Sequence, residues 1–352
     1  MSDYKYQIHA ANKIFKDALD PSKKAAVLAA CPGSGKTTIS HVAIQKYIQK
    51  YPKANVLVLT HGQNILKNQY LDSLQAPHVD IDFTFGEFDS NAQVLVGLPH
   101  SIGKYPMQKV DLLVVDECHE YYLKPMVQNI IKTLKPKHQI LLTGSPSEFN
   151  LLKSQGEKYA ITYIAGNDLV DNDVFSDVTM DVVSVDYQKN SRASMGQMYA
   201  HAQKKGQDLS KIMVAAINIR EAQNVAYYLR SIGRKVALST SKNDRSNRAV
   251  MDFKNGEYDT LVVVMRGILG FSDNNITGIF DLRCSANVDI SNQLFARVLR
   301  KHPQNIQKFY YRCGEEDGNF NDQVIMLHKI DALMRRDIFV GYNGENMGVK
   351  IS

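Results

Sequence analysis

Apolar stretches that end in polar residues recur along the first half of the chain, separated by segments with helical periodicity. With their polar ends, these stretches are residues 27–38, 55–61, 94–102, 110–119 and 139–147. Short aliphatic runs are typical of buried strands, whereas the spacing of Ile39, Val42 and Ala43 predicts a helix. Another amphipathic helix is expected through Ile14 and Phe15. We therefore expect a parallel sheet whose polar strand ends meet at one edge, the binding edge of α/β folds.

The same alternation restarts in the second half of the chain. Strand patterns lie at residues 211–218, 235–240, 260–265, 278–282 and 308–312, and helical patterns at 221–232, around Val250 and Phe253, at 291–301 and at 324–334. Strands alternating with helices of this length predict a second α/β lobe. Segment 165–186, rich in Asp and Asn, is interpreted as the connection between lobes. The sequence thus predicts an α/β protein with two domains, residues 1–165 and 166–352.

The composition is typical of a soluble globular protein, since 44% of the 352 residues are hydrophobic and 22% are charged. No apolar run approaches the roughly eighteen residues of a membrane span, and the N-terminus lacks a signal-peptide pattern. The four cysteines form no CxxC pair, so they predict neither zinc nor disulfides, and a cytoplasmic location is expected. The net charge of +6 suits a polyanionic partner but does not by itself assign one.

The strongest chemical motif is the glycine-rich turn after the first strand. Its pattern, Ala30-x-x-Gly33-x-Gly35-Lys36-Thr37, lets backbone N–H groups point at phosphate oxygens at a helix N-terminus. Lys36 is expected to reach the β- and γ-phosphates of ATP, and the Thr37 hydroxyl to hold Mg²⁺. The alternative is a glycine turn without a ligand. The predicted nucleotide contacts are Pro32, Gly33, Ser34, Gly35, Lys36, Thr37 and Thr38.

A second motif is the acidic end of the strand at 110–115. Four apolar residues deliver Asp116 and Glu117 to the sheet edge, where burial of carboxylates is costly without a cation. Asp116 is expected to hold Mg²⁺, and Glu117 to accept a proton from the water that attacks the γ-phosphate. His119 either couples hydrolysis to the second domain or satisfies a neighbouring hydrogen bond.

Three further strands end in polar side chains. Thr143 and Ser145 are expected to hydrogen-bond the acidic pair and to report whether the γ-phosphate is present, with a plain Ser-Pro turn as the alternative. Five residues after the other two strands are candidates for contact with a nucleic-acid backbone: Thr60, His61, Gln63, His100 and Ser101. For Thr60, helix capping is the alternative.

A third motif lies on the helix predicted at 291–301. At about 3.6 residues per turn, Gln293, Arg297 and Arg300 share one face, and apolar residues cover the opposite one. The helix is therefore expected to present two arginines together from an element anchored in the core. A solvated basic face is the alternative.

In this order, the motifs resemble those of superfamily 2 helicases, with Asp-Glu-Cys-His at 116–119 in place of the commoner DEAD or DEAH box. They are similar in style to the branch that holds UvsW-type phage helicases and the helicase subunits of type III restriction enzymes. The resemblance implies two tandem RecA-like domains with parallel sheets and an ATP site in the interdomain cleft. It also implies ATP and Mg²⁺ as cofactors and nucleic acid bound across both domains.

The resemblance implies roles for single residues as well. Gln7 would read the adenine edge, Gln293 would contact the nucleotide, and Arg297 and Arg300 would reach the γ-phosphate; an ordinary surface glutamine is the alternative for Gln7. Further implied nucleic-acid contacts are Asn218, Thr240 and Arg266.

The chain departs from the family pattern at three places. Leu98 and Ala296 stand where the family has threonine and glycine, and Ser272 where it has an aspartate that contacts ribose. Asp273 is then the expected ribose ligand. These departures bear on coupling and strand grip rather than on whether ATP binds.

The predicted function is ATP hydrolysis by a helicase or translocase that acts as a monomer on DNA rather than RNA, with forked or branched DNA implied. A recruiting protein is compatible with this prediction, and a membrane is not expected. The main rival is a nucleic-acid-stimulated ATPase that remodels or clamps without unwinding, or that serves in a larger complex. A catalytically silent binding module and a small-molecule kinase are further rivals. The intact charged residues argue against a binding module. The presence of a second α/β lobe argues against a small-molecule kinase.

Overall fold

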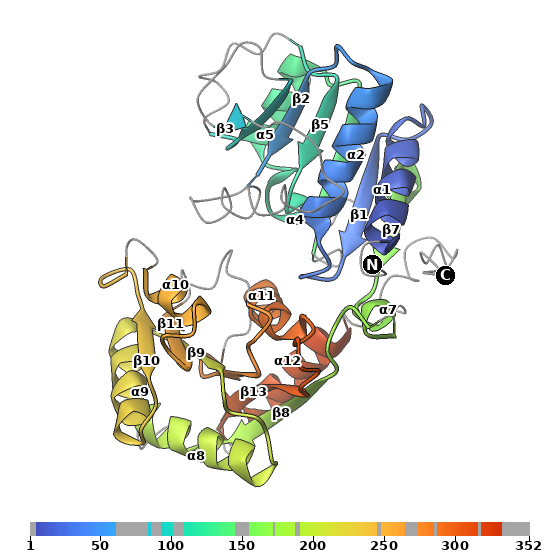
Figure 1. Ribbon diagram of the computed structural model, residues 1–352. Coiled ribbons are helices and arrows are strands. Elements are labelled where there is room, and N and C mark those ends of the chain that lie inside the picture. Colours follow the sequence, from blue (N-terminus) through green and yellow to red (C-terminus); the bar gives the residue numbers. More distant parts are fainter. Residues whose placement is uncertain are drawn as a thin grey trace. The chain divides into compact units, whose positions relative to one another are not determined.

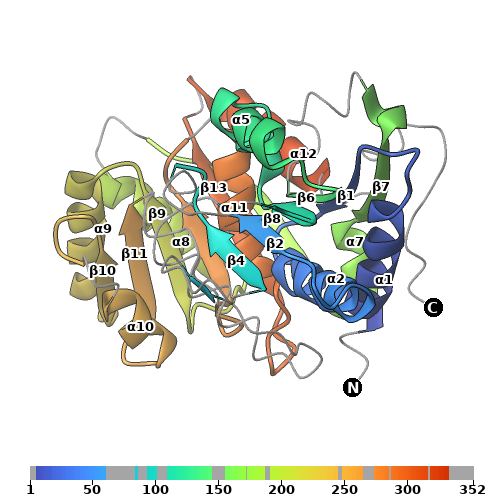
Figure 2. The ribbon, with the colours of Figure 1, turned by 90° about the horizontal axis from the view of Figure 1, so that it is seen from above.

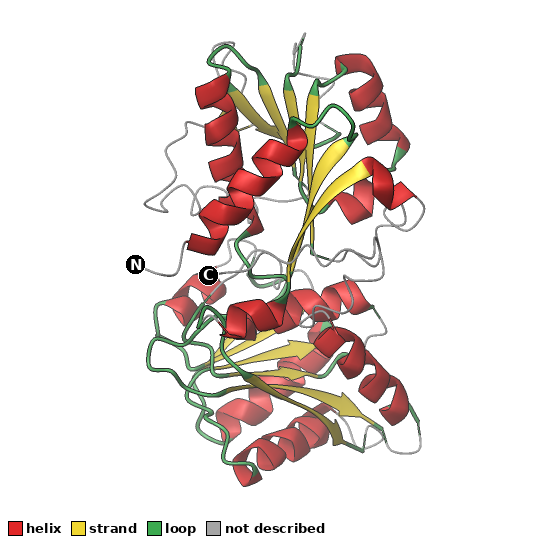
Figure 3. Cartoon of the chain, turned by 90° about the vertical axis from the view of Figure 1, so that its right-hand side faces the viewer, coloured by secondary structure: helices red, strands yellow, loops and turns green. Residues whose placement is uncertain are grey.

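The computed structural model describes residues 5–60, 84–85, 93–100, 109–144, 155–171, 173–186, 191–244, 248–264, 273–284, 287–315 and 318–332 (Figure 1). Contacts divide this part of the chain into two compact units, with the division between Leu169 and Val170. Each unit is built around its own sheet, between helices (Figure 3). No described helix has the length and apolar character needed to cross a lipid bilayer.

The sheet of the first unit has seven parallel strands among the described residues. Their order is β3 (Thr84–Phe85), β4 (Val94–Gly97), β2 (Val56–Leu59), β5 (Leu112–Val115), β6 (His138–Thr143), β1 (Ala25–Ala30) and β7 (Tyr159–Ile164). All six residues of β1 are buried, because helices cover both faces of this central strand. Figure 2 shows α1 (Lys5–Ala18) and α2 (Lys36–Lys50) on one face and α5 (Pro125–Leu134) on the other. The short helix α4 (Cys118–Tyr121) packs on the same core as α5.

The second unit repeats this architecture with six parallel strands. Their order is β10 (Val236–Ser239), β11 (Thr260–Val264), β9 (Ile212–Ala216), β12 (Gly278–Asp281), β13 (Lys308–Gly314) and β8 (Val178–Ser184). Helices α8 (Ser191–Lys204) and α9 (Ile219–Ser231) pack on one face, and α11 (Val288–Leu299) and α12 (Phe320–Ala332) on the other (Figure 1). Helix α10 (Arg248–Lys254) packs beside β10 and β11. The predicted α/β class with two parallel sheets is confirmed.

The structure corrects one sequence-based interpretation. Part of segment 165–186, expected to be a connection, forms helix α7 (Gly166–Asp171) and strand β8, which pairs with β13. Strand β8 lies at the sheet edge, and four of its seven residues are only half-buried. Its Asp181 accepts a 2.9 Å contact from His201 Nε2. An edge strand tolerates such polar residues, so its pattern lacks the continuous apolar run of a central strand.

A charged cluster lies inside the second unit. Asp281, at the end of β12, is fully buried and contacts Arg283 Nε at 2.7 Å, Arg312 Nη1 at 2.9 Å and the Tyr310 hydroxyl at 2.8 Å. Burial raises the pKa of Asp281, but Arg283 and Arg312 outweigh that effect and lower it to about 2. The carboxylate is therefore charged at neutral pH.

Arg312 extends this cluster to the helices on that face of the sheet. It donates to Ser291 Oγ of α11 at 3.0 Å and, through Nη2, to Gln323 Oε1 of α12 at 2.7 Å. Arg312 thus links β12, β13 and two helices through donors that are all inside the core.

We predict that Arg312→Met destabilises the second unit by about 3 kcal/mol or more, because it removes one partner of a buried ion pair and leaves acceptors unsatisfied. Arg248→Met is the matched control, since Arg248 is 85% exposed and lies 3.7 Å from Asp252, where a salt bridge contributes little. Urea unfolding of the full chain, with hydrogen exchange of β12 and β13 amides, measures the loss. Equal effects of the two substitutions would contradict the prediction.

The low pKa of Asp281 also predicts acid sensitivity. The folded-state pKa of about 2 lies below the ordinary value of 3.8, so the stabilisation is present above about pH 4 and is lost as the pH falls towards 2. Carboxyl ¹³C NMR should give a midpoint near 2 for this group. A midpoint at its ordinary value would show that the two arginines do not act on it in this way.

Candidate functional site

The turn between β1 and α2 has the backbone of a phosphate-binding loop. Gly33 and Gly35 have φ angles of 86° and 81°, in the left-handed region that glycine adopts without strain. Gly35 is the N-cap of α2, and no side chain caps the helix, so its first N–H groups face outward for an anion. Lys36 and Thr37 lie in the first turn of this helix. Burial raises the pKa of Cys31 to about 12, so the thiol in this turn stays protonated.

Helix α1 supports the turn from behind. The Tyr6 hydroxyl donates to the Ser34 carbonyl at 2.8 Å, and Gln7 Nε2 donates to the Tyr6 hydroxyl at 3.1 Å. A Cβ at Gly35 would lie 2.4 Å from Gln7 Nε2, so glycine is needed here for space as well as for conformation. Gln7 Oε1 and Ser34 Oγ are buried and have no hydrogen-bond partner within the described part of the chain. These two atoms can serve a polar ligand, and the turn fits a nucleotide.

The acidic pair lies at the same edge of the sheet as the turn. Glu117 has a φ angle of 46°, its N–H donates to Asp116 Oδ1 at 3.0 Å, and its Oε1 lies 4.0 Å from Lys36 Nζ. Three strands bring these groups together, because β5 pairs with β6 and β6 with β1, all in parallel. Residues about eighty positions apart therefore meet at the carboxyl ends of near-neighbouring strands.

Gly144 closes this cluster and was not singled out from the sequence. Its N–H donates to Glu117 Oε2 at 3.4 Å, and a Cβ here would lie 3.0 Å from Lys36 Nζ. The only sequence signal is a glycine directly after the apolar run of β6. Gly144 gives Lys36 and Glu117 the space to approach each other.

His119 and Thr143 also meet here. His119 Nδ1 lies 3.0 Å from Thr143 Oγ1 and 3.6 Å from Glu117 Oε2. The Thr143 hydroxyl was expected to contact the acidic pair directly. Instead, the His119 imidazole lies between this hydroxyl and the Glu117 carboxylate and links β6 to it. Ser145, the other residue expected in this role, lies outside the described residues.

Among the described residues, no group of three or more His, Cys, Asp or Glu side chains could hold a metal ion by itself. Mg²⁺ usually keeps several waters and binds through one or two protein oxygens together with substrate phosphates. The donors Asp116 and Thr37 at this edge fit that mode, in which the cation arrives with the nucleotide.

The candidate nucleic-acid contacts of the first unit are only partly described. Thr60 directly follows β2 and is buried, and its Oγ1 has no partner among the residues that the structure describes. His100 is exposed after β4. His61, Gln63 and Ser101 lie outside the described residues, as does Arg266 of the second unit. Thr60 and His100 both follow the carboxyl ends of their strands, as expected for the binding edge of the sheet. Their contact with nucleic acid stays a prediction.

In the second unit, three candidate residues have local structural partners. Asn218 is the N-cap of α9, where its side chain accepts from the Glu221 N–H at 3.0 Å. The Thr240 N–H donates to Asn243 Oδ1 at 2.9 Å in a turn after β10. Asp273 is buried and forms an ion pair with Lys211 at 2.7 Å. A ribose contact would have to compete with that ion pair.

Helix α11 carries Gln293 and Arg297, whereas Arg300 lies directly after its last residue, Leu299. Gln293 and Arg297 are half-buried on α11, whereas the apolar residues between them are buried. Arg300 follows the helix with extended backbone angles of −61° and 136° and forms a bridge with Phe175. Helix α11 ends at Leu299 because the chain turns there to pair with another segment.

The comparisons with known proteins agree with this fold. Residues 1–148, less than half of the chain, match the family described as "Type III restriction enzyme, res subunit". No curated protein matches the chain. One similar solved structure is Dbp5 from S. cerevisiae bound to RNA and ADP BeF3, with 13% identity, a TM-score of 0.65, and coverage of 94% of this chain and 96% of that one.

Two other similar structures come from prokaryotes. A fragment of a putative HsdR subunit of a type I restriction enzyme from Vibrio vulnificus YJ016 has 16% identity and a TM-score of 0.68, covering 90% of this chain and 65% of that one. The Hef helicase domain of Pyrococcus furiosus has 14% identity and a TM-score of 0.55, covering 91% and 97%. The shared fold is that of tandem RecA-like domains. With the family match, it supports the class of superfamily 2 helicase-like proteins.

We predict that Gly35→Ala lowers both stability and ATP affinity. The left-handed backbone costs an L-residue roughly 1–2 kcal/mol, and the added methyl group also displaces Gln7. Gly233→Ala is the control, because Gly233 has a φ angle of 90° and open space around its Cβ position. Thermal unfolding and calorimetric ATP titration should show a stability loss in both variants and an affinity loss only in the first. An unchanged ATP affinity in Gly35→Ala would contradict the assignment of this turn.

Proposed function

We propose that this protein is an ATP-dependent nucleic-acid motor, a helicase or translocase of superfamily 2. The observation that carries the proposal is the approach of Lys36 Nζ to Glu117 Oε1, 4.0 Å apart, beside an uncapped helix N-terminus at the carboxyl edge of a parallel sheet. A lysine and a carboxylate at that edge are the groups that hydrolysis of a nucleoside triphosphate requires. The family match over residues 1–148 supports the same class.

Each residue has a proposed role. Lys36 and the N–H groups of α2 bind the phosphates. Glu117, which is oriented by its contacts with Gly144 and His119, accepts a proton from the attacking water. Asp116 and Thr37 hold the Mg²⁺ that accompanies ATP and supplies positive charge to the phosphate oxygens. The unpartnered Gln7 Oε1 accepts a hydrogen bond from the adenine amino group.

Helix α11 supplies the remaining charge in this proposal. Arg297 and Arg300 stabilise the negative charge that develops on the γ-phosphate during hydrolysis, as arginine fingers do in other phosphoryl-transfer enzymes. Gln293 contacts the nucleotide. Because Arg300 follows α11 in an extended segment, its position depends on the bridge with Phe175 rather than on the helix.

The proposed substrate is a nucleic acid, with DNA, forked or branched, ahead of RNA. Contacts would be made mainly to phosphates, so binding should weaken as salt increases. The second candidate function is an ATPase that nucleic acid stimulates but that remodels without separating strands. The occupied side chains of Asn218 and Asp273 favour keeping this candidate, because they reduce the expected strand contacts of the second unit.

We predict that Glu117→Gln lowers the rate of ATP hydrolysis by roughly 10²–10⁴-fold, the usual contribution of a general base, with little change in ATP affinity. The control is Glu120→Gln, the same change three residues away at an exposed position. Hydrolysis is measured alone and with single-stranded DNA, single-stranded RNA and a forked duplex, beside strand displacement of that duplex.

The outcomes separate the candidates. Stimulation by a nucleic acid that Glu117→Gln abolishes, with strand displacement, is the result expected of a helicase. Stimulation without displacement would favour the remodelling ATPase. Hydrolysis that ignores every nucleic acid would overturn the proposed motor.

A further inference from the structure

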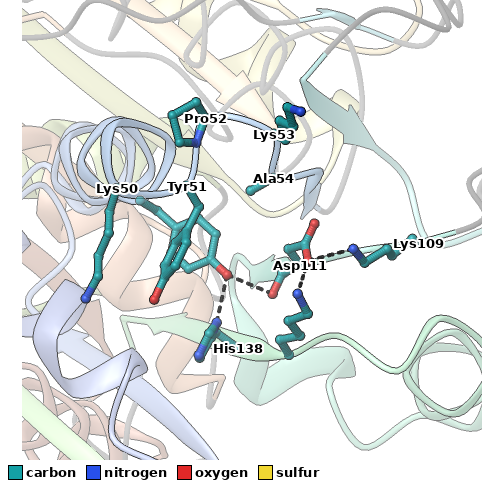
Figure 4. Close-up of a pocket in the computed structure, with 10 residues that line it drawn as sticks. Lys50, Tyr51, Pro52, Lys53, Ala54, Lys109, Asp111 and His138 are labelled. Atoms are coloured by element: carbon teal, nitrogen blue, oxygen red, sulfur yellow. Dashed lines mark hydrogen bonds and ion pairs between the residues drawn. The ribbon is translucent and has the colours of Figure 1, made fainter.

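A second pocket lies at the opposite edge of the first sheet. It has a volume of about 640 Å³ and is formed where the chain leaves α2, at Tyr51, and where it enters β5 and β6, at Asp111 and His138 (Figure 4). Helix α2 has fifteen residues between the phosphate-binding turn and this pocket, which places them roughly 22 Å apart at 1.5 Å per residue. One bound nucleotide cannot span both, so any ligand here is separate from the ATP of the proposed function.

The pocket carries more positive than negative charge. Lys137 Nζ and Lys109 Nζ lie 2.9 Å and 3.5 Å from the same oxygen of Asp111, and their side chains are 60% and 62% exposed. Lys50 and Lys53 also line the pocket. A single carboxylate cannot neutralise these lysines, so the pocket attracts an anion.

Protonation reinforces that charge pattern at neutral pH. Burial raises the pKa of Asp111, but the hydrogen bonds and charge from Lys137, the Asn55 N–H and Lys109 lower it overall. Burial and Lys137 lower the pKa of His138. The carboxylate is therefore charged and the imidazole neutral, and the excess of positive charge comes from lysines alone.

Aromatic rings form one wall of the pocket. The Tyr47 hydroxyl lies 2.7 Å from His138 Nδ1 and 3.2 Å from the Asp111 carbonyl, which holds both rings in place. Tyr51 packs against Tyr47 with ring centroids 5.0 Å apart and lies nearly parallel to His138, at 17°. Tyr51 is 38% exposed, so part of a ring remains accessible beside the lysines.

We propose that this pocket binds a nucleotide, its base against Tyr51 and its phosphate among the lysines. Lysines bind phosphate as point charges, and an exposed aromatic ring can stack on any nucleic-acid base. The volume is within the usual range for small-ligand pockets. An acidic peptide would use the charge but leave the ring without a partner. The nucleotide has two sources, a free nucleotide or one unit of a nucleic-acid strand, and both share this chemistry.

The test uses the absence of tryptophan from the chain. Tyr51→Trp places the chain's only tryptophan in the pocket, and Lys36→Ala in the same chain suppresses binding at the phosphate-binding turn. AMP, inorganic phosphate and a short single-stranded oligonucleotide are titrated separately. AMP should change the emission saturably and bind more tightly than phosphate, because only AMP has a base.

Two charge variants provide the comparison. Lys53→Glu should weaken AMP binding by roughly tenfold or more, since it replaces a charged donor in the pocket with a repelling carboxylate. Lys132→Glu makes the same charge change at an exposed position on α5 and should have little effect. Neither residue belongs to the proposed ATP site, so ATP hydrolysis in the chain that keeps Lys36 should be unchanged in both variants.

The results decide whether the pocket binds a nucleotide and whether that nucleotide is free or part of a strand. AMP binding without oligonucleotide binding supports a free nucleotide, and oligonucleotide that displaces AMP supports a strand. Equal affinity for AMP and phosphate, or equal losses in the two charge variants, would overturn the proposal. If the tryptophan variant shows no change, equilibrium dialysis of AMP against the Lys36→Ala chain that retains Tyr51 decides, and no binding there also overturns it. The dialysis does not measure hydrolysis, so this outcome is separate from failure of the proposed motor.

Discussion

The parallel pairing of β5, β6 and β1 is the constraint on which the candidate active site depends. Parallel strands end at the same edge, so the ladder from Leu112–Val115 through His138–Thr143 to Ala25–Ala30 brings Glu117, Gly144 and Lys36 together. The charged groups could not be held at this spacing by local structure, because Lys36 and Glu117 belong to distant parts of the chain. Hydrogen bonds between buried strands hold the edge, and glycines leave it open for a ligand.

In the second unit, a buried charge cluster links the sheet to the helices on one of its faces. Asp281 is shared by Arg283 and Arg312, and Arg312 also contacts the helices α11 and α12. The contact to Ser291 fixes the first turn of the helix that carries Gln293 and Arg297. A buried ion pair adds little net stability, but its loss is costly, so the cluster specifies how α11 sits on its sheet. The proposed function requires this helix to hold Arg297 in position.

The two ends of α2 have different chemistry. Its N-terminus offers N–H groups and Lys36 at the binding edge, and its C-terminus leads into the rings and lysines of the second pocket. Such a pocket at the amino ends of the strands is unusual for α/β folds, whose ligands bind at the carboxyl ends. The proposed nucleotide would therefore bind the first unit outside the hydrolysis site.

Much of this protein is determined locally. Hydrophobic periodicity predicted the central strands of both units and several of their helices, because apolar runs and helical spacing reflect burial of each element on its own. It did not predict β7, α5 or α8. The phosphate-binding turn and the acidic pair were also visible, since the chemistry of glycine, lysine and adjacent carboxylates needs only a few consecutive residues.

Tertiary structure decided what depends on partners distant in sequence. Residues 178–184 form a strand because they pair with β13 at the edge of the sheet. Arg300 lies outside the helix because its backbone pairs with Phe175. Asp273 was assigned to ribose, yet it is buried on Lys211, and Gly144 had no visible role until Lys36 and Glu117 were placed beside it. The second pocket likewise joins residues from the end of α2 and the starts of β5 and β6. Strand order within the sheet makes these contacts, and no local pattern of residues encodes that order.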